Sequence, residues 1–133
     1  MSVFSEYQTD TIDLALDFYG YEDCPKNYEF GPSVRDNFVL HFITKGKGVF
    51  HINKKEIHLE AGDLFLLPKN KVTYYKADAE DPWSYYWIGI SGTKVSDFMH
   101  FSTLHEKGFL KKTEVDTERI GQFMEQIVHK SEA

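Results

Sequence analysis

The stretch Glu60-Ala61-Gly62-Asp63-Leu64-Phe65-Leu66-Leu67-Pro68 decides the fold class. A glycine-containing turn leads into four consecutive apolar residues, and a proline follows them directly. A short, unbroken apolar run between turn residues is typical of a β-strand that is covered on both faces. Proline ends such a strand because it has no N–H to donate to the ladder. We therefore expect a buried strand over residues 64–67.

The segment before this strand is expected to form a β-hairpin. Two runs of strand-forming residues flank Asn53-Lys54, and a two-residue loop there places Phe50 opposite Ile57 and His51 opposite Glu56. One face of the hairpin is then apolar and the other is polar.

Further apolar runs predict the remaining strands. Each run is short, rich in aromatic or β-branched residues and bounded by turn residues. The expected strands cover residues 11–18, 38–43, 49–52, 55–59, 64–67, 72–77 and 83–90, and residues 20–32 are expected to form a loop. Many short strands with regular turns are typical of an antiparallel sandwich or barrel.

After Gly92 the apolar residues adopt helical spacing. A first helix is indicated by Val95, Phe98, Met99 and Phe101, and a second is expected to begin at Asp116 or Thr117. The second helix carries a wide apolar stripe, which consists of Ile120, Phe123, Met124, Ile127 and Val128. A stripe of this width needs a partner surface.

Two arrangements of the stripe are consistent with its spacing. In the first, it packs partly on the β-domain and partly on the same helix of a second subunit, which gives a homodimer. In the second, Ile120, Phe123 and Ile127 dock on the chain's own β-domain and leave only Met124 and Val128 outside.

Length, composition and charge exclude several classes of protein. The chain has 133 residues, which fits one domain, and its 41% hydrophobic residues are enough for a core. A net charge of −6 disfavours DNA binding by this chain alone. No apolar run approaches the ~20 residues of a membrane span. A single cysteine and the lack of a signal peptide predict a cytoplasmic protein.

Neither metal nor nucleophile chemistry is predicted. Only His41 lies in a strand that is expected to line the interior. The other histidines, on the polar face of the hairpin or in the helical tail, are His51, His58, His100, His105 and His129. Cys24 lies in the predicted loop with only Lys26 nearby to activate it. We therefore expect no catalytic residue, no metal site and no cofactor.

The segment Trp83-Ser84-Tyr85-Tyr86-Trp87 is the strongest candidate for ligand recognition. Alternation along a strand sends Trp83, Tyr85 and Trp87 to one face. Two indoles and a phenol can stack on the apolar face of a sugar while their polar atoms bind its rim. The same pattern also fits a packed aromatic core, and the residues alone leave both interpretations open.

Several segments together resemble the N-terminal ligand-sensing domain of AraC-type bacterial transcription regulators, and the resemblance covers most of the chain. The segments that carry it are residues 20–25, 30–32, 34–36, 40–43, 46–48, 61–68, 81–88 and 91–92. The resemblance implies a mainly β fold: a cupin-like, antiparallel, jelly-roll β-barrel over about residues 1–92, followed by two dimerising α-helices over about 93–133. The whole chain would be one sensing and dimerisation domain.

The resemblance also implies a small-molecule effector inside the barrel. The branch with the Arg35-Asp36 and Pro82-Trp83 wording resembles regulators of oligosaccharide use, which implies a sugar or oligosaccharide. Carried over by position, the contacts are Lys45, Tyr75, Tyr85 and Trp87, with His41 and Arg35 as neighbours on the same alternating face. The resemblance thereby favours a pocket over a core for the aromatic stripe.

Two departures from the family pattern bear on function. Asn70 stands where relatives often have a turn glycine, and it tolerates the left-handed conformation of such a turn. Thr73 stands where metal-binding cupins have a histidine, which disfavours the alternative of a cupin-like metalloenzyme acting on a sugar or small acid.

A further departure is that no helix-turn-helix unit fits into this acidic sequence. The resemblance therefore implies DNA contact only through a domain absent from this sequence, or else a stand-alone sensor. A pure interaction domain without a ligand is a third alternative.

Overall fold

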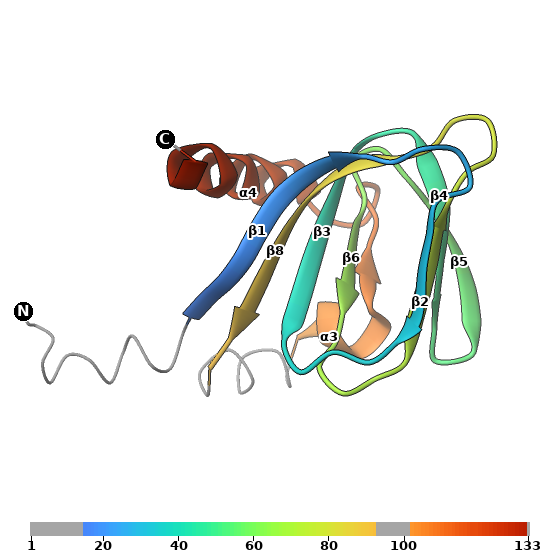
Figure 1. The fold of residues 1–133 in the computed structure, drawn as a ribbon, viewed down its shortest axis with the longest axis horizontal. Coiled ribbons are helices and arrows are strands. Elements are labelled where there is room, and N and C mark those ends of the chain that lie inside the picture. Colours follow the sequence, from blue (N-terminus) through green and yellow to red (C-terminus); the bar gives the residue numbers. More distant parts are fainter. Residues whose placement is uncertain (1–14, 93–101, 133) are drawn as a thin grey trace, which may run out of the picture.

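Two antiparallel β-sheets face each other in the computed structural model, which describes residues 15–92 and 102–132 (Figure 1). The elements are β1 (Ala15–Asp23), β2 (Glu29–Ser33), β3 (Phe38–Lys45), β4 (Lys47–Ile52), β5 (Lys55–Glu60), β6 (Leu64–Leu67), β7 (Thr73–Ala77), β8 (Ser84–Ser91), α3 (Thr103–Lys107), β9 (Phe109–Leu110) and α4 (Thr117–Glu132). One sheet has the strand order β1-β8-β3-β6-β9, and the other has the order β2-β7-β4-β5.

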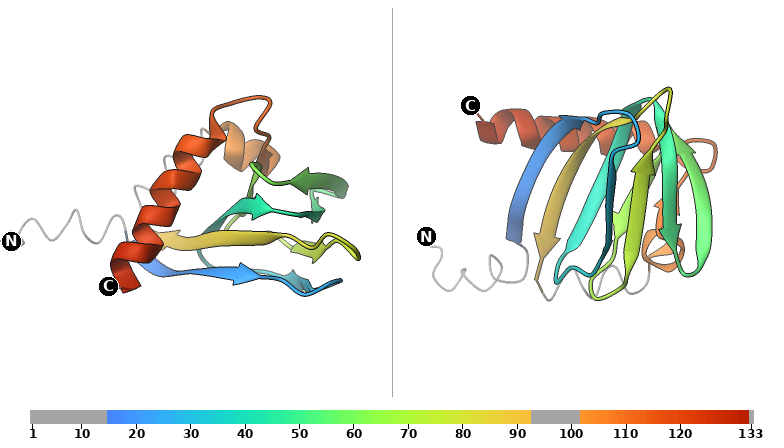
Figure 2. Two further views of the ribbon diagram at one scale, coloured as in Figure 1. Left: turned by 90° about the horizontal axis from the view of Figure 1, so that it is seen from above. Right: turned by 45° about the vertical axis from the view of Figure 1, so that its right-hand side comes forward.

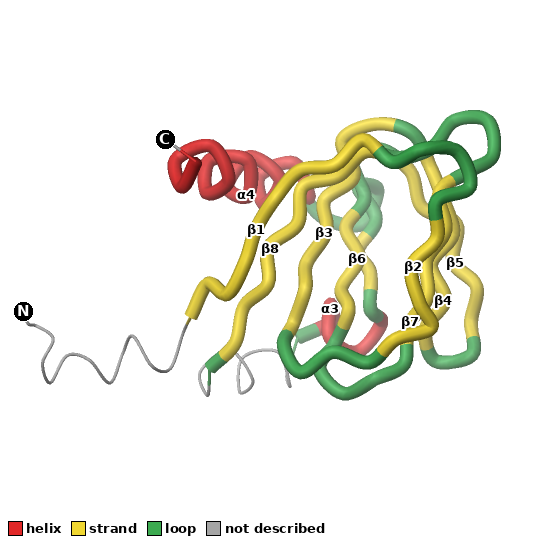
Figure 3. The backbone as a smooth tube through the Cα atoms, in the orientation of Figure 1, coloured by secondary structure: helices red, strands yellow, loops and turns green. Residues whose placement is uncertain are grey.

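The predicted fold class is confirmed: the described part of the chain is mainly β, with helices at its C-terminal end. All the pairings between its strands are antiparallel. The sheets form a jelly-roll-like sandwich and do not close into a continuous ring, so the barrel is open between them (Figure 3). This opening matters for the site because it leaves room between the two layers.

The hairpin and the buried strand follow the expected register. Strands β4 and β5 pair Phe50 with Ile57 and His51 with Glu56 around a turn in which Asn53 has a φ of 53°. All four residues of β6 are buried, as their unbroken apolar run predicted. Strand β6 lies between β3 and β9 in its sheet. One face of β6 contributes Phe65 and Leu67 to the core between the sheets, and the other contributes Leu64 and Leu66 to the core under α4.

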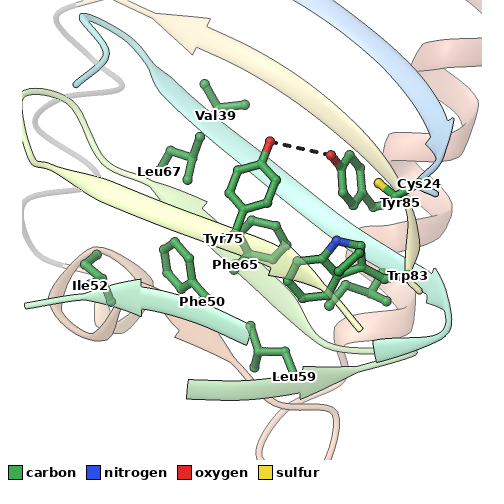
Figure 4. Close-up of a cluster of buried hydrophobic side chains, with 12 residues drawn as sticks. Cys24, Val39, Phe50, Ile52, Leu59, Phe65, Leu67, Tyr75, Trp83 and Tyr85 are labelled. Carbon is green, nitrogen blue, oxygen red and sulfur yellow. Dashed lines mark hydrogen bonds between the residues drawn. The ribbon is translucent and has the colours of Figure 1, made fainter. Parts of the chain in front are cut away.

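Alternation along β3 divides the apolar residues between two cores. The side chains that point between the sheets are Val39, His41 and Ile43, whereas Phe38, Leu40 and Phe42 belong to the opposite face. The core between the sheets is strongly aromatic, and Figure 4 shows the rings of Phe65, Tyr75 and Tyr85 converging there. The layer between the sheets is therefore where aromatic side chains could meet a ligand.

Helix α4 covers the outer face of the five-stranded sheet (Figure 2). Met124 and Val128 are 0% and 1% exposed there, whereas Phe123 is 61% exposed. The second of the two arrangements, in which Ile120, Phe123 and Ile127 dock on the β-domain and leave Met124 and Val128 outside, is therefore wrong. Ile120 and Ile127 are half-buried at the edges of the contact.

The rotation of α4 follows from two small contacts that the apolar stripe does not include. The helix begins at Thr117, as expected, and the buried Thr117 hydroxyl donates a hydrogen bond to the carbonyl of Gly62. One turn later Gly121 lies against the Phe42 ring, where an added Cβ would be 2.4 Å from ring carbons. Residues 117, 121, 124 and 128 share one helix face, so Met124 and Val128 turn inward with them.

The prediction of a loop over residues 20–32 is also wrong in part. Residues 20–23 continue β1, and residues 29–33 form β2. Gly20 fits inside a strand because the Trp87 indole on the neighbouring strand occupies the space of its missing side chain. Pro32 is tolerated because β2 is at the edge of its sheet, where no second partner strand needs its N–H.

The remaining helical prediction concerns the segment just before residue 102. The helix expected from Val95 to Phe101 lies outside the described residues. A short helix, α3, follows that segment, and the Ser102 side chain caps it by accepting a hydrogen bond from the N–H of His105. Neither described helix combines the length and apolar character that crossing a bilayer requires.

Candidate ligand-binding site

A cavity of about 240 Å³ lies between the two sheets. Strands of both sheets and the segments that join them supply its lining, which consists of Phe18, Glu22, Tyr28, Phe30, Arg35, Val39, His41, Leu67, Tyr75, Tyr85 and Trp87. Larger hollows exist on the surface, such as one of about 370 Å³ with mostly charged and polar lining beside the β4–β5 hairpin. The cavity between the sheets combines aromatic walls with a few polar groups, which is the usual character of a ligand site.

Five of the six predicted ligand-binding residues meet at this cavity. They are Arg35, His41, Tyr75, Tyr85 and Trp87. Lys45 does not join them: its side chain is 70% exposed, and its Nζ lies 3.7 Å from a carboxylate oxygen of Asp23. Lys45 lies four residues beyond His41, roughly 13 Å along the strand, and the register of β3 shifts after Ile43. The prediction for Lys45 as a cavity residue is therefore wrong.

The aromatic stripe of β8 is divided between core and cavity. Trp83 is fully buried and stacks on Phe65 with a centroid separation of 5.2 Å, so it belongs to the core. Trp87 is half-buried and lines the cavity. Tyr85 lies between them, in ring contact with both indoles. Each of the two interpretations of the stripe therefore holds for part of it.

The hydroxyls of Tyr75 and Tyr85 meet at 3.5 Å, as the dashed line in Figure 4 shows. Burial raises the pKa of both phenols, so both hydroxyls are protonated at neutral pH. A protonated hydroxyl can donate one hydrogen bond and accept others. The pair can therefore both donate hydrogen bonds to the hydroxyl groups of a ligand and accept hydrogen bonds from them.

His41 is a neutral, buried imidazole beside the two tyrosines. Its ring stacks on Phe65 at 4.2 Å and meets the Tyr75 and Tyr85 rings edge-on. Burial lowers the pKa of His41 from 6.5 to about 3, and this outweighs nearby backbone carbonyls that favour the charged form. Within the described residues its Nδ1 has no hydrogen-bond partner. A buried polar atom without a partner is costly, so this nitrogen is a polar group that the surrounding aromatic core leaves unsatisfied.

Two glycine–aromatic pairs shape the wall formed by β1 and β8. Gly20 is opposite Trp87, and Gly89 is opposite Phe18. A Cβ at Gly20 would lie 2.4 Å from the indole, and a Cβ at Gly89 would lie 2.2 Å from the Phe18 ring. Each ring therefore lies against the glycine of the neighbouring strand, and a side chain in place of either glycine would displace it.

Two charged residues of opposite sign complete the lining. The Arg35 guanidinium lies 5.1 Å above the centre of the Phe18 ring, in a cation–π contact. Glu22 is half-buried on β1 and pairs with Tyr85 of β8. Sequence reasoning did not predict four of the lining residues, which are Phe18, Glu22, Tyr28 and Phe30.

These lining residues were missed because most of them lie in the segment that was expected to be a loop. A usable signal was present for Glu22. The alternation of the predicted strand over residues 11–18 continues through Phe18, Gly20 and Glu22, which places all three on one face.

Metal-ligand chemistry is poorly represented in this part of the chain. The described residues contain no cluster of three or more His, Cys, Asp or Glu side chains that could hold a metal ion. Thr73 is buried on β7, and Asn70 has the expected left-handed backbone with a φ of 65°. Cys24 is buried, and burial raises the pKa of its thiol to about 11, so the thiol is protonated at neutral pH.

The chain is similar in sequence to several curated transcription regulators. The chain is 46% identical over 107 residues to the Msm operon regulatory protein of Streptococcus mutans, covering 80% of this chain and 38% of that protein. It is 41% identical to the raffinose operon transcriptional regulatory protein of Pediococcus pentosaceus, covering 73% and 36%. It is 33% identical to the lactose operon transcription activator of Staphylococcus xylosus, covering 73% and 35%. The chain thus spans little more than a third of these relatives.

Solved structures show the same fold at low sequence identity. The cupin domain of Schizosaccharomyces pombe Cnp3 superposes with a TM-score of 0.53 at 15% identity, over 67% of this chain and 71% of that one. A predicted oxalate decarboxylase from Thermotoga maritima gives 0.52 at 17% identity, over 68% and 75%. The fold is therefore cupin-like. Residues 15–133 match the family described as the AraC-like ligand binding domain, and the chain belongs to that family.

Proposed function

We propose that this domain binds a small carbohydrate in the cavity between its sheets and acts as the effector sensor of a sugar-operon regulator. The observation that carries the proposal is that the Trp87 indole, packed against Gly20, lines the same cavity as Tyr75 and Tyr85, whose hydroxyls meet at 3.5 Å. Sugars present apolar C–H faces and polar hydroxyl rims, and this wall offers a partner to each. Two relatives named for raffinose and lactose operons support a sugar as the ligand class.

The size of the cavity favours one sugar ring inside it. A volume of about 240 Å³ is below the ~300–1,000 Å³ of typical drug-sized sites. The neutral His41 ring adds an unpartnered nitrogen among the aromatic side chains. Further units of an oligosaccharide would extend outward from the opening between the sheets.

Binding without catalysis is the role that these residues support. His41 is a single imidazole among tyrosines and apolar rings, and the lining offers only Glu22 as a carboxylate. DNA binding in this proposal belongs to the remaining part of a longer regulator. The acidic domain described above supplies the ligand response.

Replacing Trp87 by Ala is expected to abolish a sugar-induced rise in melting temperature. Losing the stacking face costs roughly 1–3 kcal/mol of binding, or about ten- to a hundredfold in affinity. A thermal-shift series with raffinose, lactose and galactose measures this, because a ligand that binds the native state raises its apparent stability. Tyr74→Ala is the matched control, since Tyr74 is on the outer side of β7 and bonds to Glu29. A folded Trp87→Ala variant with an unchanged response would contradict the proposed site.

We also propose that the exposed side of α4 forms a homodimer contact. Phe123 is 61% exposed on this helix, and a large aromatic side chain in water is a common anchor of subunit contacts. Phe123→Glu is expected to shift the protein from dimer to monomer in sedimentation velocity while its circular dichroism spectrum stays the same. Wild-type protein that is monomeric at high micromolar concentration would exclude this contact.

A further inference from the structure

The cavity holds one negative and one positive side chain that do not neutralise each other. Glu22 and Arg35 both line it, and within the described residues neither has an oppositely charged group within 4.0 Å. Arg35 instead lies over the Phe18 ring. Glu22 is half-buried on β1. Two partly buried charges left apart in this way are satisfied by water or by a ligand that reaches both.

The electrostatic influence of both groups extends into the cavity. Burial is the main cause of the raised pKa of Tyr28 and Tyr75, and the negative charge of Glu22 raises both further. The positive charge of Arg35 adds to the burial that lowers the pKa of His41. The interior of the site is therefore balanced: one carboxylate, one guanidinium and one uncharged imidazole.

The position of Lys45 decides the sign of this balance. If Lys45 pointed into the cavity, the site would carry a net positive charge and would suit a phosphate or a carboxylate. Its ammonium group instead lies beside Asp23 on the surface. A phosphorylated ligand would gain Arg35 and would face Glu22 at the same time, without a second cation to offset the repulsion.

We propose that Glu22 is a specificity-determining residue that restricts the effector to uncharged sugars and excludes sugar phosphates and sugar acids. The inference rests on the proposed function, because it assumes that the cavity binds a carbohydrate. Hydroxyl groups both donate and accept hydrogen bonds, so an uncharged sugar can donate to the Glu22 carboxylate and accept from the Arg35 guanidinium. An anionic sugar can do only the second without repulsion.

Isothermal titration at low ionic strength tests this with galactose, glucose and the 6-phosphate of each. The wild-type domain is expected to bind at least one of the free sugars and neither phosphate. Glu22→Gln keeps the shape and the acceptor oxygen but removes the charge. It is expected to gain about tenfold or more in affinity for a 6-phosphate and to lose a few-fold for the free sugar, because a charge-assisted hydrogen bond is replaced by a neutral one.

The opposite signs of these two changes distinguish specificity from damage to the fold. A variant with a distorted cavity would weaken binding of every probe. Glu80→Gln removes the same charge from an exposed position between β7 and β8, and it is expected to match the wild type with all four probes.

Each remaining outcome overturns a defined statement. If the free sugar binds and the phosphate binds wild type and Glu22→Gln equally well, the charge-filter inference is wrong and the sugar-binding proposal stands. If the wild type binds only the phosphates, the charge-filter inference is wrong and the carbohydrate-binding proposal stands. If neither protein binds any of the four probes, both proposals are wrong. If the wild type responds instead to a zwitterionic amino acid such as glutamine, the two charges serve an ammonium and a carboxylate, and both proposals are wrong.

Discussion

Met124→Glu is expected to lower the free energy of unfolding by about 4 kcal/mol or more. Met124 of α4 is fully buried against the sheet, in the cluster that contains Phe38, Leu40 and Ile88. Truncation of a buried methionine alone costs roughly 2–5 kcal/mol, and a carboxylate without a partner adds a desolvation cost of several kcal/mol. A domain of this size has only about 5–15 kcal/mol in total, so the variant should be largely unfolded or should release α4.

Urea denaturation followed by far-UV circular dichroism measures this change. Gln126→Glu is the matched control, because it adds the same charge to an exposed position on the same helix. Its free energy of unfolding is expected to stay within about 0.5 kcal/mol of the wild type. Equal stability of the Met124→Glu and Gln126→Glu variants would show that α4 does not pack on the sheet in solution.

Acid is expected to destabilise the domain well above the pH at which carboxylates titrate. In the unfolded chain His41 gains a proton near pH 6.5, whereas burial holds its pKa at about 3 in the folded state. Between these values the unfolded state binds more protons, so folded-state stability is present above pH 6.5 and falls as the pH decreases. The slope is about 1.4 kcal/mol per pH unit, or roughly 2.7 kcal/mol by pH 4.5.

The His41→Phe variant isolates this contribution. It keeps an aromatic ring against Phe65 and removes the titrating group, while the other histidines still titrate in both proteins. The free energy of unfolding of both proteins is measured in urea from pH 7.5 to 4.5. The wild type should lose roughly 2.7 kcal/mol more than the variant over this range. A difference that stays constant over this range would mean that His41 has the same pKa in the folded and unfolded states, as a solvent-exposed histidine would.

Sequence patterns predicted those elements in which local chemistry decides the structure. Strand β6 is a four-residue apolar run between a glycine turn and a proline, and both ends are determined locally. The β4–β5 hairpin follows from its two-residue turn, and α4 begins at the threonine that was expected. In each case the residues that determine the element are neighbours in the chain.

The errors arose where contacts between distant segments override local patterns. Residues 20–23 carry loop-like chemistry, but the Trp87 ring fills the space above Gly20 and makes a strand possible. The rotation of α4 depends on Phe42 accepting Gly121, a residue that a hydrophobic pattern ignores. Lys45 was carried over by position from the family resemblance, and the register of β3 shifts between Ile43 and Lys45.

The candidate site was predicted only as far as its strands were. Residues on β3 and β8 were found because their strands were recognised, and Glu22 was missed because the end of β1 was not. Arg35, Tyr75 and Lys45 came from the family resemblance alone. Neither the charge balance of the cavity nor the exclusion of Lys45 could be read from spacing, because both depend on where a strand ends relative to the opposite sheet.

In the Gly20–Trp87 and Gly89–Phe18 pairs, the aromatic ring is on β8 in the first and on β1 in the second. The large side chain of this ligand-facing wall can therefore come from either strand. An aromatic ring on one strand requires a vacant Cβ on the other, so neither member of a pair can be varied independently. A mutant library that randomises position 87 alone keeps Gly20 unchanged, so only the side chain on β8 varies. Randomising position 20 together with 87, and 89 together with 18, would allow the large side chain of each pair to move to the other strand. The cavity could then fit ligand shapes that single substitutions cannot reach.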